Sequence, residues 1–305
     1  MAGLPKYQNI MRKSLAKIPT TLAYFALVIC FVLQSARYSK AFLDGITVWA
    51  RNVLPVIFPF ALLTQLFTKH CKFNKISVTK LLFGIRCDEI FFTSFLCGYP
   101  MGARVISEQN IDKKCAAFLL SFCSTPSPIF VITTVGTALC NTTATTIVCA
   151  SQLVAMLLNG LLHRQKNLFF EQAQQNSNDR DFGNMVTNSI LAVLTIGALI
   201  ALFFMLTEIV QSLLPQSIAN HPALFFTIGL LEMTSGILKI CSSCDILCST
   251  VCSSALLAFG GLCVALQCFA FTSKKGVRFF SLLKMKCTQC AFATIVAFIL
   301  GKIFL

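Results

Sequence analysis

Residues 95–109 read FLCGYPMGARVISEQ, and this short stretch decides how the chain is organised. It lies among long apolar runs, yet it holds two glycines, a proline, an arginine and a glutamate between positions 98 and 108. Pro100 lacks a backbone N–H group and restricts Tyr99 before it, so residues 90–108 are not expected to form one continuous helix. We predict two half-helices that return to the same side of a membrane, a re-entrant hairpin.

The composition around this stretch is that of a membrane protein. Of the 305 residues, 56% are hydrophobic and only 12% are charged, and the mean hydropathy is +0.77. Soluble domains have roughly 25% charged residues, so this chain cannot cover a soluble globule with polar surface. The sequence therefore predicts an all-α integral membrane protein in a lipid bilayer. The net charge of +14 comes from loops between apolar runs, which indicates cytoplasmic loops and no nucleic-acid partner.

Seven apolar runs are long enough to cross a bilayer. They cover residues 18–35, 43–67, 111–140, 143–162, 186–214, 248–272 and 287–305. Two of these runs are interrupted, one by STPSP at 124–128 and one by Gly260 and Gly261. We predict that each interrupted run crosses as two half-helices. Residues 222–240 are broken by Thr234, Ser235 and Gly236 and predict a second re-entrant hairpin.

The breaks recur in the same order in both parts of the chain. Gly98 precedes Pro126 by 28 residues, and Ser235 precedes Gly261 by 26. With the N-terminus inside, the basic segments 1–17, 68–89 and 273–286 all fall on the cytoplasmic side, and the C-terminus falls outside. The two halves then have opposite orientations. The predicted fold is an inverted repeat, each half with a re-entrant helical hairpin and a broken transmembrane helix.

This pattern also gives the predicted domain organisation. Residues 1–42 hold an N-terminal cytoplasmic segment and the first transmembrane helix, and residues 43–162 form the first repeat. A polar cytoplasmic linker follows at 163–185, and residues 186–305 form the second repeat.

Inverted repeats with paired broken helices are typical of secondary transporters, which bind their solute at the repeat interface. Broken helices leave free N–H groups that favour anions and free carbonyl oxygens that favour cations. We therefore expect a carrier of a small polar or anionic solute, with a coupling ion and a homo-oligomer left open. The rival hypotheses are a non-transporting membrane protein in signalling or assembly, and a membrane enzyme.

The predicted substrate-binding residues are the helix breakers, hydroxyls and charges at the four breaks. Arg104 and Glu232 are the charges nearest the two hairpin breaks, and an intramembrane charge marks a site by default. The alternative for Arg104 is that it reaches the cytoplasmic interface or pairs with Glu108. The full set is Gly98, Tyr99, Pro100, Gly102, Arg104, Ser124, Thr125, Ser127, Glu232, Thr234, Ser235, Gly260 and Gly261.

Catalytic and metal chemistry find little support in the sequence. No nucleophile-and-base set, phosphate-binding loop or HExxH motif occurs, so we predict no enzymatic activity and no cofactor. The cysteine pairs CSSC at 241–244 and CTQC at 287–290 have no further ligands at metal-site spacing, so we predict no metal site.

Several quoted motifs resemble one known family. LPVIFPFALLTQLF (54–67), CGYPMGARVISE (97–108) and SFCSTPSPIFVI (121–132) are similar to the sporulation integral membrane proteins of spore-forming Gram-positive bacteria. LEMTSGI (231–237) and AFGGLCVALQ (258–267) are similar to the second half of that family. The resemblance covers residues 43–270. The family carries nucleoside-recognition Gate domains and is distantly similar to concentrative nucleoside transporters.

The resemblance implies a role in late sporulation, because the best-known members are thought to move dipicolinic acid across the outer forespore membrane. It therefore implies a bacterial cell membrane, the outer forespore membrane in particular. The family often has two asparagines where this chain has Ser124 and Thr125, and an asparagine where it has Ser235. These differences leave the identity of the solute open. A nucleoside is the alternative to dipicolinate.

Overall fold

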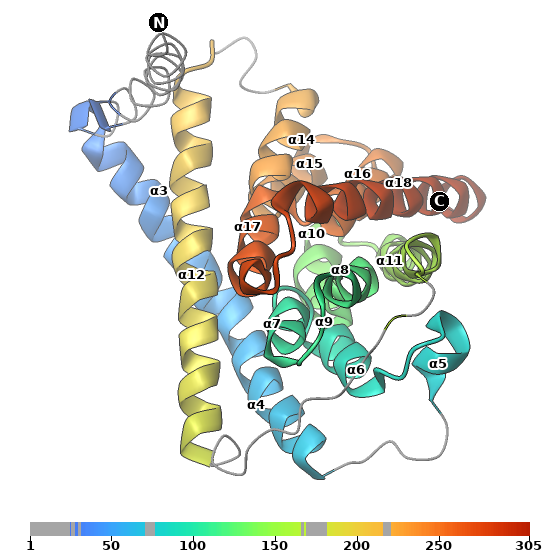
Figure 1. Ribbon diagram of the computed structural model, residues 1–305. Coiled ribbons are helices and arrows are strands. Elements are labelled where there is room, and N and C mark those ends of the chain that lie inside the picture. Colours follow the sequence, from blue (N-terminus) through green and yellow to red (C-terminus); the bar gives the residue numbers. More distant parts are fainter. Residues whose placement is uncertain are drawn as a thin grey trace, which may run out of the picture.

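The computed structural model describes residues 32–70, 77–165, 182–215 and 221–305, together with Phe25, Val28, Ile29 and Leu168. Side chains are described throughout this part except at 56 and 64–70. Every regular element in these residues is a helix (Figure 1), which confirms the predicted all-helical class. Most of the predicted first crossing, 18–35, and most of the predicted linker, 163–185, lie outside the described residues.

The helices follow one another along the chain in two series. The first series contains α3 (Ser35–Val48), the π-helix η1 (Trp49–Val53), α4 (Leu54–His70), α5 (Val78–Phe83), α6 (Asp88–Cys97), α7 (Met101–Glu108), α8 (Lys113–Cys123), α9 (Pro128–Phe130), the π-helix η2 (Val131–Gly136), α10 (Thr137–Leu139) and α11 (Thr142–Leu162). The second contains α12 (Phe182–Ser212), α14 (Pro222–Leu231), α15 (Met233–Ser243), α16 (Ile246–Phe259), α17 (Gly261–Thr272), the 3-10 turn η4 (Ser273–Lys275) and α18 (Phe279–Phe304).

Five helical segments in the described residues are long and apolar enough to cross a membrane. They are Lys113–Leu139, Thr142–Leu162, Phe182–Ser212, Ile246–Lys275 and Phe279–Phe304. A sixth candidate is the pair Ser35–Val53 and Ile57–Leu63, which is bent by 46°. These spans are typical of a multi-pass membrane protein, as the sequence predicts. Two of them contain the predicted interruptions, at 124–127 and at Gly260.

The boundaries differ from the prediction in two places. α3 begins at Ser35, so residues 36–42, which lie between the first two predicted apolar runs, are helical. α18 begins at Phe279, not at residue 287, so Lys284 and Lys286 belong to a helix and not to a basic loop. Residues 279–286, between the observed and the predicted start of this helix, are rich in Leu, Met and Lys and have high helix propensity. The prediction assigned them to a loop because of their positive charge. This second difference matters for the site.

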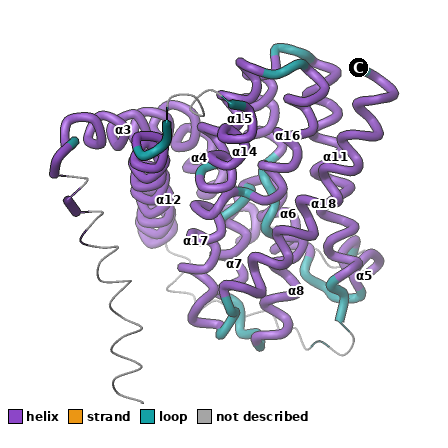
Figure 2. The backbone as a smooth tube through the Cα atoms, turned by 90° about the horizontal axis from the view of Figure 1, so that it is seen from above, coloured by secondary structure: helices purple, strands orange, loops and turns teal. Residues whose placement is uncertain are grey.

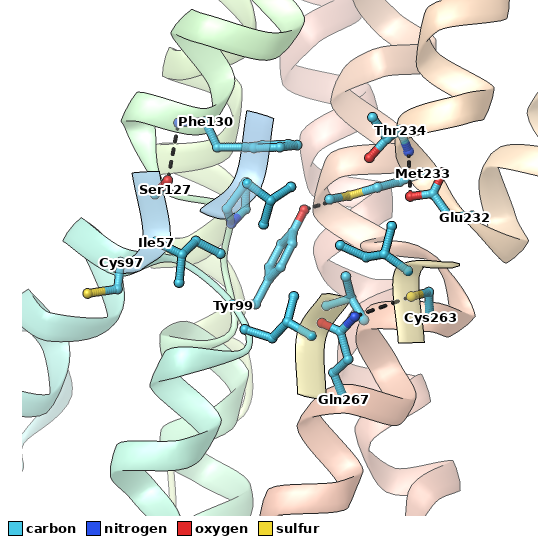
Figure 3. A pocket seen from close by; sticks show the side chains of 15 residues that line it. Ile57, Cys97, Tyr99, Ser127, Phe130, Glu232, Met233, Thr234, Cys263 and Gln267 are labelled. Carbon is cyan, nitrogen blue, oxygen red and sulfur yellow. Dashed lines mark hydrogen bonds between the residues drawn. The ribbon is translucent and has the colours of Figure 1, made fainter. Parts of the chain in front are cut away.

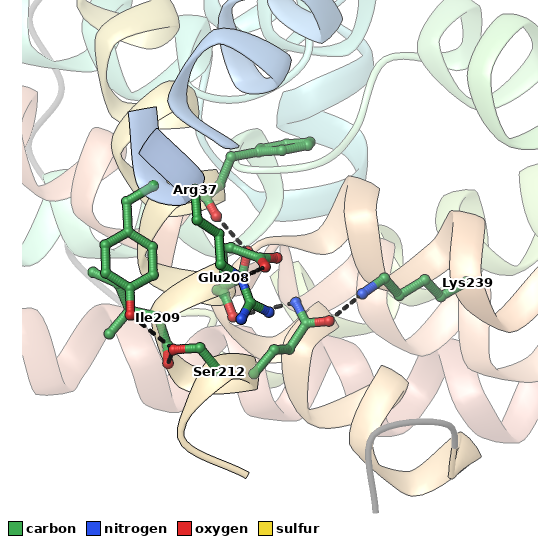
Figure 4. A network of polar contacts seen from close by, with 9 residues as sticks. Arg37, Glu208, Ile209, Ser212 and Lys239 are labelled. Atoms are coloured by element: carbon green, nitrogen blue, oxygen red, sulfur yellow. Dashed lines mark hydrogen bonds and ion pairs between the residues drawn. The ribbon is translucent and has the colours of Figure 1, made fainter. Parts of the chain in front are cut away.

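Helix α3 packs against α12 and crosses it obliquely (Figure 1). Gly197 of α12 permits the contact with Trp49, because a Cβ at this position would lie 2.5 Å from a carbon of the indole ring. At one end of the pair, Arg37 Nε donates to Glu208 Oε1 at 2.6 Å, and Tyr38 Oη lies 2.8 Å from Ser212 Oγ (Figure 4). Both side chains of the ion pair are partly exposed, so it contributes at most about 1 kcal/mol.

Helices α11, α16 and α18 pack together on the other side of the molecule, and Figures 1 and 2 show α12 running across their direction. Small residues make the closest contact, since Ala155, Ala258 and Ala293 are fully or almost fully buried against one another. Ser151 Oγ also donates to Ser254 Oγ at 3.0 Å. Small side chains allow helix backbones to approach where lipid supplies no hydrophobic driving force. The helix breaks lie between this bundle and α12.

Candidate functional site

The two breaks of the first half contact each other directly. α6 ends at Cys97, and Gly98 follows with a φ of 73°, a conformation that suits glycine. The Tyr99–Pro100 peptide bond is cis, and α7 begins at Met101. The N–H group of Tyr99 donates to the carbonyl of Thr125 at 2.8 Å. A Cβ at Gly98 would lie 2.5 Å from the backbone nitrogen of Ser127, so only glycine fits this approach.

The two breaks of the second half also meet. α14 ends at Leu231 and α15 begins at Met233, so the break falls at Glu232. The Glu232 carboxylate caps α15, because its oxygens accept the N–H groups of Thr234 at 3.0 Å and Ser235 at 2.7 Å. A Cβ at Gly261, the first residue of α17, would lie 3.0 Å from the Leu231 carbonyl oxygen. Helix α17 therefore begins against the α14–α15 break.

The sequence prediction placed the second hairpin break two residues too late. Thr234, Ser235 and Gly236 are not the break but the first turn of α15. Gly236 serves close packing between the two helices, since a Cβ there would lie 2.5 Å from the Gly229 nitrogen on α14. The chain can break at Glu232 because this side chain supplies the cap itself.

A pocket lies where the four breaks converge (Figure 3). Its volume is about 40 Å³, which is room for about three water molecules. Both halves contribute to its walls. The lining residues are Val53, Ile57, Cys97, Tyr99, Pro126, Ser127, Phe130, Ile196, Ile200, Glu232, Met233, Thr234, Cys263, Val264 and Gln267.

Tyr99 joins the two sides of this pocket. Its side chain extends from the first-half breaks toward α15 (Figure 3), and its hydroxyl lies 2.8 Å from Met233 Sδ and 3.2 Å from the Leu257 carbonyl. Gln267 faces the pocket from α17 and donates from Nε2 to Cys263 Sγ at 3.3 Å. The walls thus combine apolar surface with a few convergent polar groups, the usual character of a small-molecule site.

The predicted site residues divide into three groups. Tyr99, Ser127, Glu232 and Thr234 line the pocket. Thr125 faces a separate apolar pocket of about 90 Å³, and its carbonyl accepts from Tyr99. The remaining residues shape the backbone or lie outside the lining: Gly98, Pro100, Gly102, Arg104, Ser124, Ser235, Gly260 and Gly261. The sequence did not single out Gln267, because nothing near it in the chain distinguishes it from other helical glutamines.

Arg104 is buried but does not belong to the pocket lining. Its Nε donates to Glu108 Oε1 at 3.1 Å, and its Nη1 donates to the carbonyl of Asn188 on α12 at 2.8 Å. The pairing with Glu108 is the alternative that the sequence left open. Arg104 therefore fastens α7 to α12, and the structure supplies no contact between it and the pocket.

Lys286 is the functional candidate that sequence reasoning missed. It lies on α18 with 2% of its surface exposed. Its ammonium donates to the Ser124 carbonyl and lies 4.8 Å from the centre of the Tyr99 ring. The sequence did contain a signal for this position. Lys284 and Lys286 are two residues apart in a segment of good helix formers, so a helix there would turn only one of the two lysines inward.

Metal ligands and homologues give no further guidance. In the part of the chain that the structure describes, no group of three or more His, Cys, Asp or Glu side chains could hold a metal ion. Comparison with family models, with curated proteins and with solved structures finds no match to this chain.

Proposed function

We propose that this protein is a secondary transporter that carries a small polar solute through the pocket between its two sets of helix breaks. One observation carries the proposal: breaks from both halves of the chain converge on a single pocket lined by Tyr99, Ser127, Glu232 and Gln267. Non-helical backbone at membrane depth is tolerated only where it is buried in protein or lines a cavity. The predicted inverted repeat and the re-entrant hairpins belong to this proposal.

The charges near the pocket favour an uncharged polar solute over a dicarboxylate. Glu232 is the acid in the lining, and its carboxylate already caps α15. The nearby cations are engaged elsewhere, Arg104 with Glu108 and Asn188, and Lys286 with Ser124. A carboxylate, a carboxamide and hydroxyls suit a solute that offers several hydrogen-bond donors.

A dipicolinate carrier of the outer forespore membrane is the narrower alternative, and the motif resemblance supports it. It requires a cation at the pocket for the dianion, because an uncompensated charge is expensive to bury. Lys286 could serve only after it leaves the Ser124 carbonyl. A nucleoside needs no cation, so the charges of the lining favour it, and the pocket of about 40 Å³ must widen to hold either solute.

The test measures ligand binding to purified protein, with nucleosides, dipicolinate and other dicarboxylates as the panel. Gln267→Met removes a pocket carboxamide, and Gln289→Met is its control, because Gln289 is equally buried on α18 outside the lining. Thr234→Val is paired with Thr227→Val, which alters an exposed threonine of the same hairpin. We expect a nucleoside Kd that weakens about tenfold in the two pocket variants, the loss of one hydrogen bond, and stays unchanged in the controls.

Uptake into proteoliposomes then separates a carrier from a binding protein. Binding without uptake would indicate a signalling or assembly role. Binding of dipicolinate alone would support the narrower alternative. If no ligand of the panel binds, or if Gln267→Met binds like the wild type, the pocket is not the solute site.

A further inference from the structure

Lys286 is a buried cation without a carboxylate partner in the part of the chain that the structure describes. Among the described residues, the ion pairs are Arg37–Glu208 and Arg104–Glu108, and neither involves it. Its ammonium contacts the backbone carbonyl of Ser124 and the face of the Tyr99 ring. Burying an isolated charge costs several kcal/mol unless its surroundings compensate it, so the compensation must come from these uncharged groups.

Two helix C-termini supply that compensation. α8 ends at Cys123 with Ser124 as its C-cap, and α6 ends at Cys97 with Gly98 as its C-cap. The two ends are joined by the hydrogen bond from Tyr99 N–H to the Thr125 carbonyl. Each helix C-terminus has carbonyl oxygens without helical partners and a partial negative charge. The junction of the two ends is therefore a place where a cation is favourable.

A buried polar network holds α18 in register with this junction. Asn159 of α11 donates from Nδ2 to the Ser121 carbonyl at 2.7 Å and to the Met285 carbonyl at 3.1 Å. Its Oδ1 accepts from Thr288 Oγ1 at 2.6 Å. Ser121 lies one turn before Ser124, and Met285 precedes Lys286. These contacts fix the ammonium against the end of α8.

We propose that the Lys286 ammonium fills a monovalent-cation site at the α6–α8 junction and replaces a free ion there. Unwound backbone carbonyls and half-helix C-termini are the groups that hold coupling ions in membrane carriers. The ammonium carries the same single charge and donates to one of these carbonyl oxygens, that of Ser124. The chain thus brings its own cation to the break, and its folded state does not depend on sodium. This inference concerns the fold and does not require any particular solute.

Removal of the lysine side chain opens the site to a free ion. Thermal unfolding of purified protein in detergent tests this, in choline chloride and with sodium or ethylammonium replacing choline at constant ionic strength. The variant is Lys286→Ala, and Lys284→Ala is the control because Lys284 is exposed on the same helix. We expect Lys286→Ala to unfold about 5 °C below the control in choline. Sodium or ethylammonium should recover most of that loss, and wild type and control should not respond.

Three results overturn the proposal. In the first, Lys286→Ala unfolds at the same temperature as Lys284→Ala. In the second, its loss of stability is the same in all three salts. The third concerns Lys286→Met, which keeps the apolar stem and carries the test if the alanine variant does not fold. The ammonium supplies nothing if this variant unfolds at the wild-type temperature.

Discussion

Single charged side chains neutralise helix ends around the pocket. Glu232 places its carboxylate on the N-terminal N–H groups of α15, and Lys286 places its ammonium on the C-terminal carbonyl of α8. Each charge therefore has a structural partner of opposite partial charge. The helix ends that the sequence suggested as anion and cation sites for a solute are occupied by residues of the chain itself.

Arg104 is also a single charged residue, but it joins α7 to α12 and does not neutralise a helix end. We expect Arg104→Gln to lower the free energy of unfolding by about 1–2 kcal/mol, because it loses charge-assisted hydrogen bonds to Glu108 and Asn188. The Kd of a pocket ligand should stay within about twofold. Ligand-dependent thermal shift reports both quantities. Glu108→Gln removes only the partly exposed partner and should cost less. A selective loss of dicarboxylate binding in Arg104→Gln would restore the anion-site prediction.

At the scale of elements, each half joins its hairpin break to the break in its following span. In the first half the link is a backbone hydrogen bond from Tyr99 to Thr125. In the second half it is close packing of Gly261 on the Leu231 carbonyl. Because both links are between backbones, a shift of either break transmits to its partner. Tyr99 then connects the two pairs through Met233.

Two glycines allow this packing to be measured. Gly261 and Gly276 share a φ of 73°, so alanine is strained at both. A Cβ at Gly261 would also lie 3.0 Å from a carbonyl oxygen, whereas at Gly276 the nearest atom is Lys113 Cδ at 3.8 Å. We expect Gly276→Ala to cost about 1 kcal/mol and Gly261→Ala about 1–2 kcal/mol more. Chemical or thermal unfolding checks the difference. Equal losses of stability in the two variants would mean that the α14–α15 break can move to make room for a side chain at position 261.

The sequence placed three of the four breaks on the residues where the helices end, and the fourth two residues too late. Glycine and proline have local conformational requirements, so Gly98–Pro100, STPSP and Gly260–Gly261 are visible without tertiary information. The break at Glu232 was misplaced because a glutamate is an ordinary helix residue until its carboxylate caps the next helix. The sequence predicts a loop at Lys286 because lysine is seldom buried, but the structure places it on α18, buried and in contact with Ser124.

At the scale of the whole molecule, the predicted membrane orientation requires certain loops to lie at the same end of the protein. Lys275 Nζ donates to the Gln109 carbonyl at 2.6 Å, so the end of the first hairpin adjoins the basic turn after α17. The sequence predicted both segments on the cytoplasmic side. The composition also predicted a membrane protein, but the pocket depends on contacts between residues far apart in the chain. Gln267 and Met233, for example, meet Tyr99 only in the folded protein.

Cysteine accessibility tests the predicted topology. With every native cysteine except Cys140 replaced, a membrane-impermeant maleimide should label Asn110→Cys and Lys275→Cys from the cytoplasmic side and Cys140 from the outside. Gly183→Cys and Leu213→Cys should label from opposite sides, because α12 is predicted to cross. The α12 pair is the more stringent test. Both α12 and α18 are predicted to cross the membrane, yet α12 runs across the direction of α18 (Figures 1 and 2). Labelling of 110 and 275 from opposite sides would contradict the inverted repeat.

The contact between Trp49 and Gly197 provides a natural optical probe. The chain has one tryptophan, and its indole Nε1 is buried with no hydrogen-bond partner among the described residues. The ring sits where the π-helix η1 meets α12, next to the bend between α3 and α4. Indole fluorescence shifts to longer wavelength when the ring meets water or a polar group. Any rearrangement that separates these helices would therefore change the tryptophan emission of the unlabelled protein, and all of that tryptophan signal would come from this one position.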